Sequence, residues 1–154
     1  MNRLTSLLGT WQGTGHGEYP TITSFDYTET LTFQANQNQD VIHYIQQTWR
    51  KDNDGQAIDS HWESGFICQL DDGSIEISNV QNSGRMELLA GQIRDADDAL
   101  ELTLQSVQLA NDIRMKETSR VWRWTGDTLI YDMHMATQNT PELQIHLRAE
   151  LKKG

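Results

Sequence analysis

The stretch GTWQGTGHGEYPT, residues 9–21, has glycine at positions 9, 13, 15 and 17, in the same alternation as Trp11. A phosphate-binding loop also uses glycines, because they let backbone N–H groups close on an anion. Neither the Lys-Ser/Thr pair nor the helical pattern that would follow such a loop is found after it. The alternation instead predicts a strand whose glycines leave room on one face for another backbone or for a flat ligand.

Apolar and polar residues alternate in short segments along the rest of the chain, and polar turns such as DNDG (52–55) and NSG (82–84) separate the segments. Hardly any stretch has apolar residues at helical spacing. The pattern predicts an all-β fold of about ten antiparallel strands, joined mostly by turns of hairpin length. After the glycine strand, the predicted strands are TETLTFQAN (28–36), VIHYIQQTWR (41–50), SHWESGFICQL (60–70), SIEISNVQN (74–82), RMELLAGQI (85–93), ALELTLQSVQL (99–109), KETSRVWRW (116–124), DTLIYDMHM (127–135) and LQIHLRAEL (143–151).

Ten antiparallel strands in an up-and-down order can protect their edges by closing into a β-barrel. A barrel of that size encloses more space than its own side chains fill, so we expect a ligand cavity. Gly-x-Trp, as at residues 9–11, is typical of the first strand of lipocalin-like barrels, where the tryptophan closes one end. No linker or repeat interrupts the pattern, and we therefore expect residues 1–154 to form a single domain of lipocalin-like or fatty-acid-binding-protein-like architecture.

The composition excludes several classes of partner. The chain carries 22 acidic and 12 basic side chains, a net charge of -10, which repels phosphate backbones and anionic membrane surfaces. We therefore expect no nucleic-acid and no membrane partner. The single cysteine, Cys68, cannot form an internal disulfide, and no stretch approaches the length of a membrane span, so we expect a cytoplasmic protein. The composition leaves open whether it is a monomer or a homodimer.

Three segments carry motifs that occur together in one protein family. Residues 9–15 read Gly-x-Trp-x-Gly-x-Gly and continue into Tyr19-Pro20-Thr21. HWESGF (61–66) is similar to a His-x-Glu-x-Gly-aromatic strand, and MAT (135–137) is followed by LQIHL (143–147). In this order and spacing, the three motifs resemble the nitrobindin family of haem-binding barrels, which are related in shape to fatty-acid-binding proteins. The resemblance extends from about Leu8 to Leu151.

The resemblance implies a b-type haem in one open end of the barrel, with His146 as the axial ligand of its iron. It also implies catalytic roles for His146 and His61, places Thr21 and His61 at the haem faces, and assigns haem contacts to the glycine strand, namely Gly9, Trp11, Gly13 and Gly15. The family is credited with converting peroxynitrite to nitrate, as a peroxynitrite isomerase, and with binding nitric oxide. The expected partners are thus haem and small nitrogen-oxide ligands.

Strand periodicity alone argues against ligation by His146. In LQIHLRAEL, the apolar face contains Ile145 and Leu147, and His146 lies on the polar face. Its imidazole can reach the cavity only if a β-bulge or the barrel rim turns it inward. Relatives commonly have proline where this chain has Ile145, so the end of this strand is less constrained here.

His61 shares its strand face with Glu63, and it is either an exposed strand histidine or a residue of the distal pocket. Relatives often have methionine at the position of Ser60, so the distal side is expected to be wetter in this chain. Neither of the two departures from the family removes a ligand.

A carrier of a fatty acid or another small apolar ligand is the alternative function. Arg120 shares a face with Trp122 and Trp124, so it is expected to point inward, where it needs a carboxylate partner. That partner could be a haem propionate, a glutamate or a fatty-acid head group. The Arg-x-Tyr clamp of intracellular lipid-binding proteins is absent near the C-terminus, which disfavours the carrier.

Overall fold

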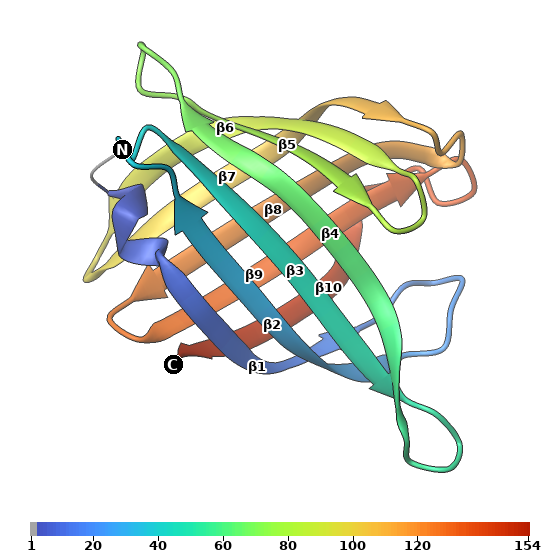
Figure 1. Ribbon diagram of the computed structural model, residues 1–154. Helices are drawn as coiled ribbons and strands as arrows, with labels where there is room; N and C mark the ends of the chain where they lie inside the picture. Colours follow the sequence, from blue (N-terminus) through green and yellow to red (C-terminus); the bar gives the residue numbers. More distant parts are fainter. Residues whose placement is uncertain (1–2) are drawn as a thin grey trace.

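A computed structural model describes residues 3–154 and contains ten antiparallel strands in a closed barrel (Figure 1). Each strand pairs with its neighbours in the sequence, and β1 pairs with β10 to close the sheet. The predicted all-β, up-and-down barrel is therefore confirmed. The strands are β1 (Gly9–Gly17), β2 (Phe25–Ala35), β3 (Val41–Lys51), β4 (Ala57–Gln69), β5 (Ile75–Gln81), β6 (Met86–Ala96), β7 (Ala99–Ala110), β8 (Met115–Thr125), β9 (Thr128–Thr137) and β10 (Gln144–Lys153).

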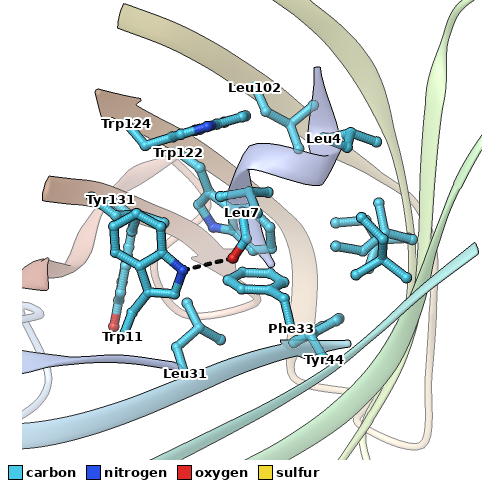
Figure 2. Close-up of a cluster of buried hydrophobic side chains, with 14 of the residues drawn as sticks. Leu4, Leu7, Trp11, Leu31, Phe33, Tyr44, Leu102, Trp122, Trp124 and Tyr131 are labelled. Atoms are coloured by element: carbon cyan, nitrogen blue, oxygen red, sulfur yellow. Dashed lines mark hydrogen bonds between the residues drawn. The ribbon is translucent and has the colours of Figure 1, made fainter. Parts of the chain in front are cut away.

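The interior is apolar at the end of the barrel where β1 begins. A short 3-10 helix, η1 (Leu4–Leu7), covers this end and inserts Leu4 and Leu7 among the strands (Figures 1 and 2). Trp11 is 0% exposed, and its indole Nε1 donates a hydrogen bond to the backbone oxygen of Leu7 at 2.7 Å. The tryptophan thus closes one end of the barrel, as the sequence predicted, and its polar atom is satisfied by the helix.

The glycines of β1 make room for protein. A Cβ atom on Gly13 would lie 2.0 Å from the backbone oxygen of Glu150 on β10. On Gly15 it would lie 2.2 Å from the ring of Tyr27, and on Gly17 2.3 Å from the ring of Phe25. Of the two occupants that the sequence left open, another backbone or a flat ligand, the structure has protein atoms in this space, and haem contacts by these glycines stay a prediction.

The opposite end of the barrel is polar and carries the connections β1–β2, β3–β4, β5–β6, β7–β8 and β9–β10, because alternate turns of an up-and-down sheet gather at one end (Figure 1). Four register shifts lie toward this end, and two of them flank the candidate site: one on β10 between Ile145 and Leu147, and one where Thr48 and Trp49 of β3 face β4. Buried polar side chains fill the adjoining interior: Glu29, Gln46, Thr48, Glu63, Asn79, Gln81, Glu87, Thr118 and Arg120. Within residues 3–154, the structure contains no helix of the length and hydrophobicity that crossing a membrane requires.

Candidate functional site

A cavity of about 340 Å³ opens at the polar end of the barrel and brings His146 and His61 together. Its lining combines apolar side chains with titratable ones, as small-molecule sites usually do. The lining residues are Gln46, Ser60, His61, Glu63, Gln81, Asn82, Ser83, Arg85, Arg120, Trp122, Tyr131, Met133, Met135, His146 and Leu147.

His146 lies at the bulge in β10, which turns it out of the strand alternation. Ile145 pairs with His134 and Leu147 pairs with Met133, so His146 is the extra residue of β10 at this point. The imidazole therefore lines the cavity, although strict alternation would have placed it outside. The bulge that the sequence-based hypothesis required is present.

The segment after β1 fixes the orientation of the His146 ring. Nδ1 of His146 lies 3.0 Å from the backbone oxygen of Glu18, and the backbone N–H of Glu18 donates to the oxygen of His146 at 2.8 Å. A carbonyl only accepts, so Nδ1 carries the proton and Nε2 keeps its lone pair. Nε2 makes no hydrogen bond with any residue in the described part of the chain, 3–154. It is thus the atom that is able to ligate a metal.

Burial keeps the His146 imidazole neutral. Removal from water lowers the pKa of His146 below its ordinary value of 6.5 and outweighs the opposite effect of the Glu18 carbonyl. The positive charge of Arg85 lowers the pKa further. A neutral imidazole is the form that binds metals.

Tyr19 anchors the loop that holds His146. Its hydroxyl has one proton, which it donates to the backbone oxygen of Met135 at 3.1 Å, with the oxygen of Thr140 as a longer second acceptor at 3.4 Å. The Tyr19 ring meets the His146 ring edge to face, with centroids 5.7 Å apart. Glu18 and Tyr19 were not predicted as site residues, and the only signal for either was the place of Tyr19 in the family motif.

His61 lies on the inner face of β4, as its shared alternation with Glu63 allowed. Its Nε2 lies 3.0 Å from Glu63 Oε1, and its backbone N–H donates to Thr48 Oγ1 at 3.0 Å. The side chain is 33% exposed and reaches the cavity, whereas Glu63 beneath it is 1% exposed. Ser60 also lines the cavity, so the polar residue that replaces the family's methionine faces the site.

Arg120 points inward and is neutralised by glutamates of the barrel. Its Nη1 donates to Glu63 Oε2 at 2.8 Å, and its Nη2 donates to Glu63 Oε1 at 3.1 Å and to Glu87 Oε1 at 2.5 Å. Burial alone raises the pKa of Glu63, but the Arg120 charge and the hydrogen bonds from His61 and Arg120 outweigh it, so the pKa lies far below its usual range. The sequence left a haem propionate, a glutamate or a fatty-acid head group as the partner of Arg120, and in the structure the partners are glutamates.

A second buried carboxyl group, Glu29, belongs to a chain of hydroxyl groups. Tyr131 donates to Glu29 Oε1 at 2.5 Å, Gln46 Nε2 donates to Oε2 at 3.0 Å, and the hydroxyls of Tyr131 and Tyr27 lie 2.7 Å apart. Burial raises the pKa of Glu29 from 4.5 to about 7, against the effect of these hydrogen bonds. Glu29 is therefore partly protonated near neutral pH.

The remaining predicted haem contacts lie outside the cavity lining. Gly9 and Trp11 lie at the closed end of the barrel, where Gly9 has φ +123° and faces Lys153. Gly13 and Gly15 are packed against protein, and Thr21 is exposed in the loop between β1 and β2. Haem contacts by these five residues stay predictions that the cavity does not support.

A closed ten-stranded barrel with a histidine-lined cavity at one end defines a ligand-binding β-barrel protein. The chain belongs to the family of THAP4-like, heme-binding beta-barrel domains, whose model matches residues 1–153. The resemblance to haem-binding barrels drawn from the three motifs is thereby confirmed.

Known proteins match the chain over nearly its whole length. A protein from Arabidopsis thaliana named peroxynitrite isomerase Rv2717c is 38% identical over 150 residues, which cover 97% of this chain and 86% of that protein. A peroxynitrite isomerase from Nocardia farcinica is 33% identical over 153 residues, which cover 97% of this chain and 88% of that protein. The crystal structure of Rv2717c from M. tuberculosis is similar with a TM-score of 0.86 at 30% identity, covering 100% of this chain and 98% of the other.

Proposed function

We propose that this protein binds haem b in the cavity between His146 and His61, with His146 Nε2 as the iron ligand, and that it isomerises peroxynitrite to nitrate. The observation that carries the proposal is the His146 imidazole, which is neutral, held through Nδ1 by Glu18, and open at Nε2 toward the cavity. Family membership and the names of the relatives support the same reading.

The residues present fit a haem. A single oriented imidazole suffices to hold haem iron, because the porphyrin supplies the other in-plane ligands. Around His146 the cavity offers apolar surface from Trp122, Met133, Met135 and Leu147 for the porphyrin face. The cavity is open to solvent, which suits a planar group whose charged edge stays near water.

When bound, haem supplies a ferric iron that acts as a Lewis acid toward the peroxide oxygen of peroxynitrite. The reaction breaks one O–O bond and forms one N–O bond within the same set of atoms, so it needs no oxidant, reductant or co-substrate. The protein would thus have two tasks. It would leave the iron accessible to peroxynitrite, and it would keep the two parts of the cleaved peroxynitrite together in the cavity. His61, held by Glu63, lines the same cavity as His146 and is the second imidazole near the proposed haem.

The alternative function, a carrier of fatty acids, is disfavoured because the Arg120 guanidinium is already paired with carboxylates of the protein. A fatty-acid head group would have to displace two buried carboxylates, Glu63 and Glu87, from the guanidinium. The proposal also includes nitric oxide, which would bind to the same haem iron at the coordination position that the protein leaves open.

Stopped-flow decay of peroxynitrite tests the proposed reaction. The haem-loaded protein should accelerate the decay more than free haem at equal concentration does, and should raise nitrate at the expense of nitrite. The haem-free protein should have no such effect. Acceleration no greater than that by free haem would contradict the enzymatic proposal and leave a haem-binding protein.

A further inference from the structure

Charge is divided unevenly along the cavity. In its deep part, Arg120 faces two buried carboxylates, Glu63 and Glu87, so that anions outnumber the cation. At the loops the balance is reversed, because Arg85 and Arg114 share the single carboxylate of Asp112. Hydrogen bonds from Arg114 and Arg85 lower the pKa of Asp112 to about 2, so this cluster carries one surplus positive charge at neutral pH.

Arg85 places that surplus positive charge in the lining of the cavity. It lies in the turn between β5 and β6 and lines the cavity together with His146 and His61, and its side chain is only 14% exposed. Arg114 is 76% exposed and does not line the cavity.

The Arg85 guanidinium has an unused donor. Nη2 donates to Asp112 Oδ2 at 3.1 Å, but Nε is buried and has no hydrogen-bond partner within residues 3–154. A buried donor left without a partner is costly, so a guanidinium in this state is prepared to accept a ligand. The Nε–H can donate to one oxygen of a carboxylate or of a nitrogen oxyanion, beside the Nη2 that already binds Asp112.

We propose that Arg85 anchors a planar, delocalised anion at the open end of the cavity, a role that rests on the proposed function. Two sources share this chemistry: a propionate carboxylate of the bound haem, or a nitrogen oxyanion such as nitrate. Either one would satisfy Nε and neutralise the surplus charge.

Arg120 is a weaker candidate for the same role, although its Nε also lacks a partner. Both of its terminal nitrogens bind carboxylates, and an anion placed there would meet the negative charges of Glu63 and Glu87. Arg85 has one carboxylate partner, and Arg114 neutralises that partner independently.

The test compares Arg85→Met with a matched control, Arg114→Met, which removes an exposed arginine from the same carboxylate. Arg85→Lys keeps the charge beside Asp112 and lacks Nε, so it tests the proposal if Arg85→Met does not fold. The first arm titrates haem and haem dimethyl ester, whose propionates are blocked, into wild type and variants. The second arm follows thermal unfolding of the haem-free proteins in sodium nitrate, against sodium chloride at equal ionic strength.

If the anion is a propionate, Arg85→Met weakens haem binding by roughly tenfold or more, and wild type loses the same factor with the dimethyl ester. If the anion is a nitrogen oxyanion, haem affinity is unchanged, and nitrate stabilises wild type and Arg114→Met but not Arg85→Met. The proposal is overturned if wild type and Arg85→Met have the same haem affinity and are stabilised equally by nitrate. Should wild type bind no haem, the proposed function fails, whereas the nitrate arm still decides the role of Arg85.

Discussion

The backbone oxygen of Glu18 lies 3.0 Å from Nδ1 of His146, so the end of the glycine strand determines which nitrogen of the histidine is free. The same two residues also exchange a backbone hydrogen bond of 2.8 Å, which extends the β1–β10 pairing past the bulge. The stretch that begins at Gly9 therefore closes one end of the barrel through Trp11 and orients the candidate iron ligand at the other end.

Tyr19→Phe tests the loop that carries Glu18. The change removes the hydroxyl that donates to Met135, with Thr140 as the longer second acceptor, but keeps the ring that contacts His146. We expect haem affinity to fall by roughly 2- to 10-fold, the equivalent of one hydrogen bond, because the Glu18 carbonyl is held less firmly. Equilibrium titration of haem measures this effect. Unchanged affinity would mean that the ring alone positions the loop.

Gly13→Ala tests the close approach of β1 and β10. A methyl group at this position would lie 2.0 Å from the backbone oxygen of Glu150, and backbone cannot move aside as a side chain can. We expect a loss of roughly 3 kcal/mol in the free energy of unfolding, measured by urea denaturation. The control is Gln12→Ala, at the neighbouring exposed position, which should change the stability by less than about 0.5 kcal/mol. Equal effects would contradict the packing role of Gly13.

Glu29→Gln tests the raised pKa of the buried carboxyl group. Burial raises the pKa of Glu29 from 4.5 to about 7, so the fold favours the protonated form. Its contribution to stability is present below about pH 4.5 and is lost as the pH rises through about 7. The amide of the variant does not titrate. Between pH 5 and pH 8, wild type should therefore lose roughly 2 to 3 kcal/mol of stability relative to the variant.

Urea denaturation of wild type and Glu29→Gln at each pH gives this difference directly. Other titrating groups, such as the histidines, are common to both proteins and cancel. A difference that stays constant with pH would show that Glu29 is ionised throughout, with its negative charge stabilised by Tyr131 and Gln46.

The barrel could be predicted from the sequence because alternation and turn residues are local signals. These signals predicted the ten strands but not helix η1, whose four residues are too short for a helical period. The closing role of Trp11 was predicted from the Gly-x-Trp motif of lipocalin-like barrels. The inward position of Arg120 followed from its alternation with two tryptophans. Its partners did not, since Glu63 and Glu87 lie 57 and 33 residues away in the sequence.

The candidate site was predictable only in part. Periodicity placed His146 on the outer face, and only the family resemblance indicated that a bulge would turn it inward. The family resemblance assigned the glycines to the haem, whereas alternation shows that a side chain is missing but cannot show which atoms fill the space. The role of Glu18 is performed by its backbone oxygen, which leaves no signal in the identity of the side chain.

The most direct test of the account is haem titration of His146→Ala, followed in the Soret region. His134→Ala is the matched control, because it removes a half-buried histidine from β9 that does not line the cavity. The account predicts that His146→Ala folds as wild type does and loses haem affinity by more than about 100-fold, while His134→Ala keeps it. Tight haem binding by His146→Ala, with the spectrum of the wild type, would contradict the assignment of the iron ligand.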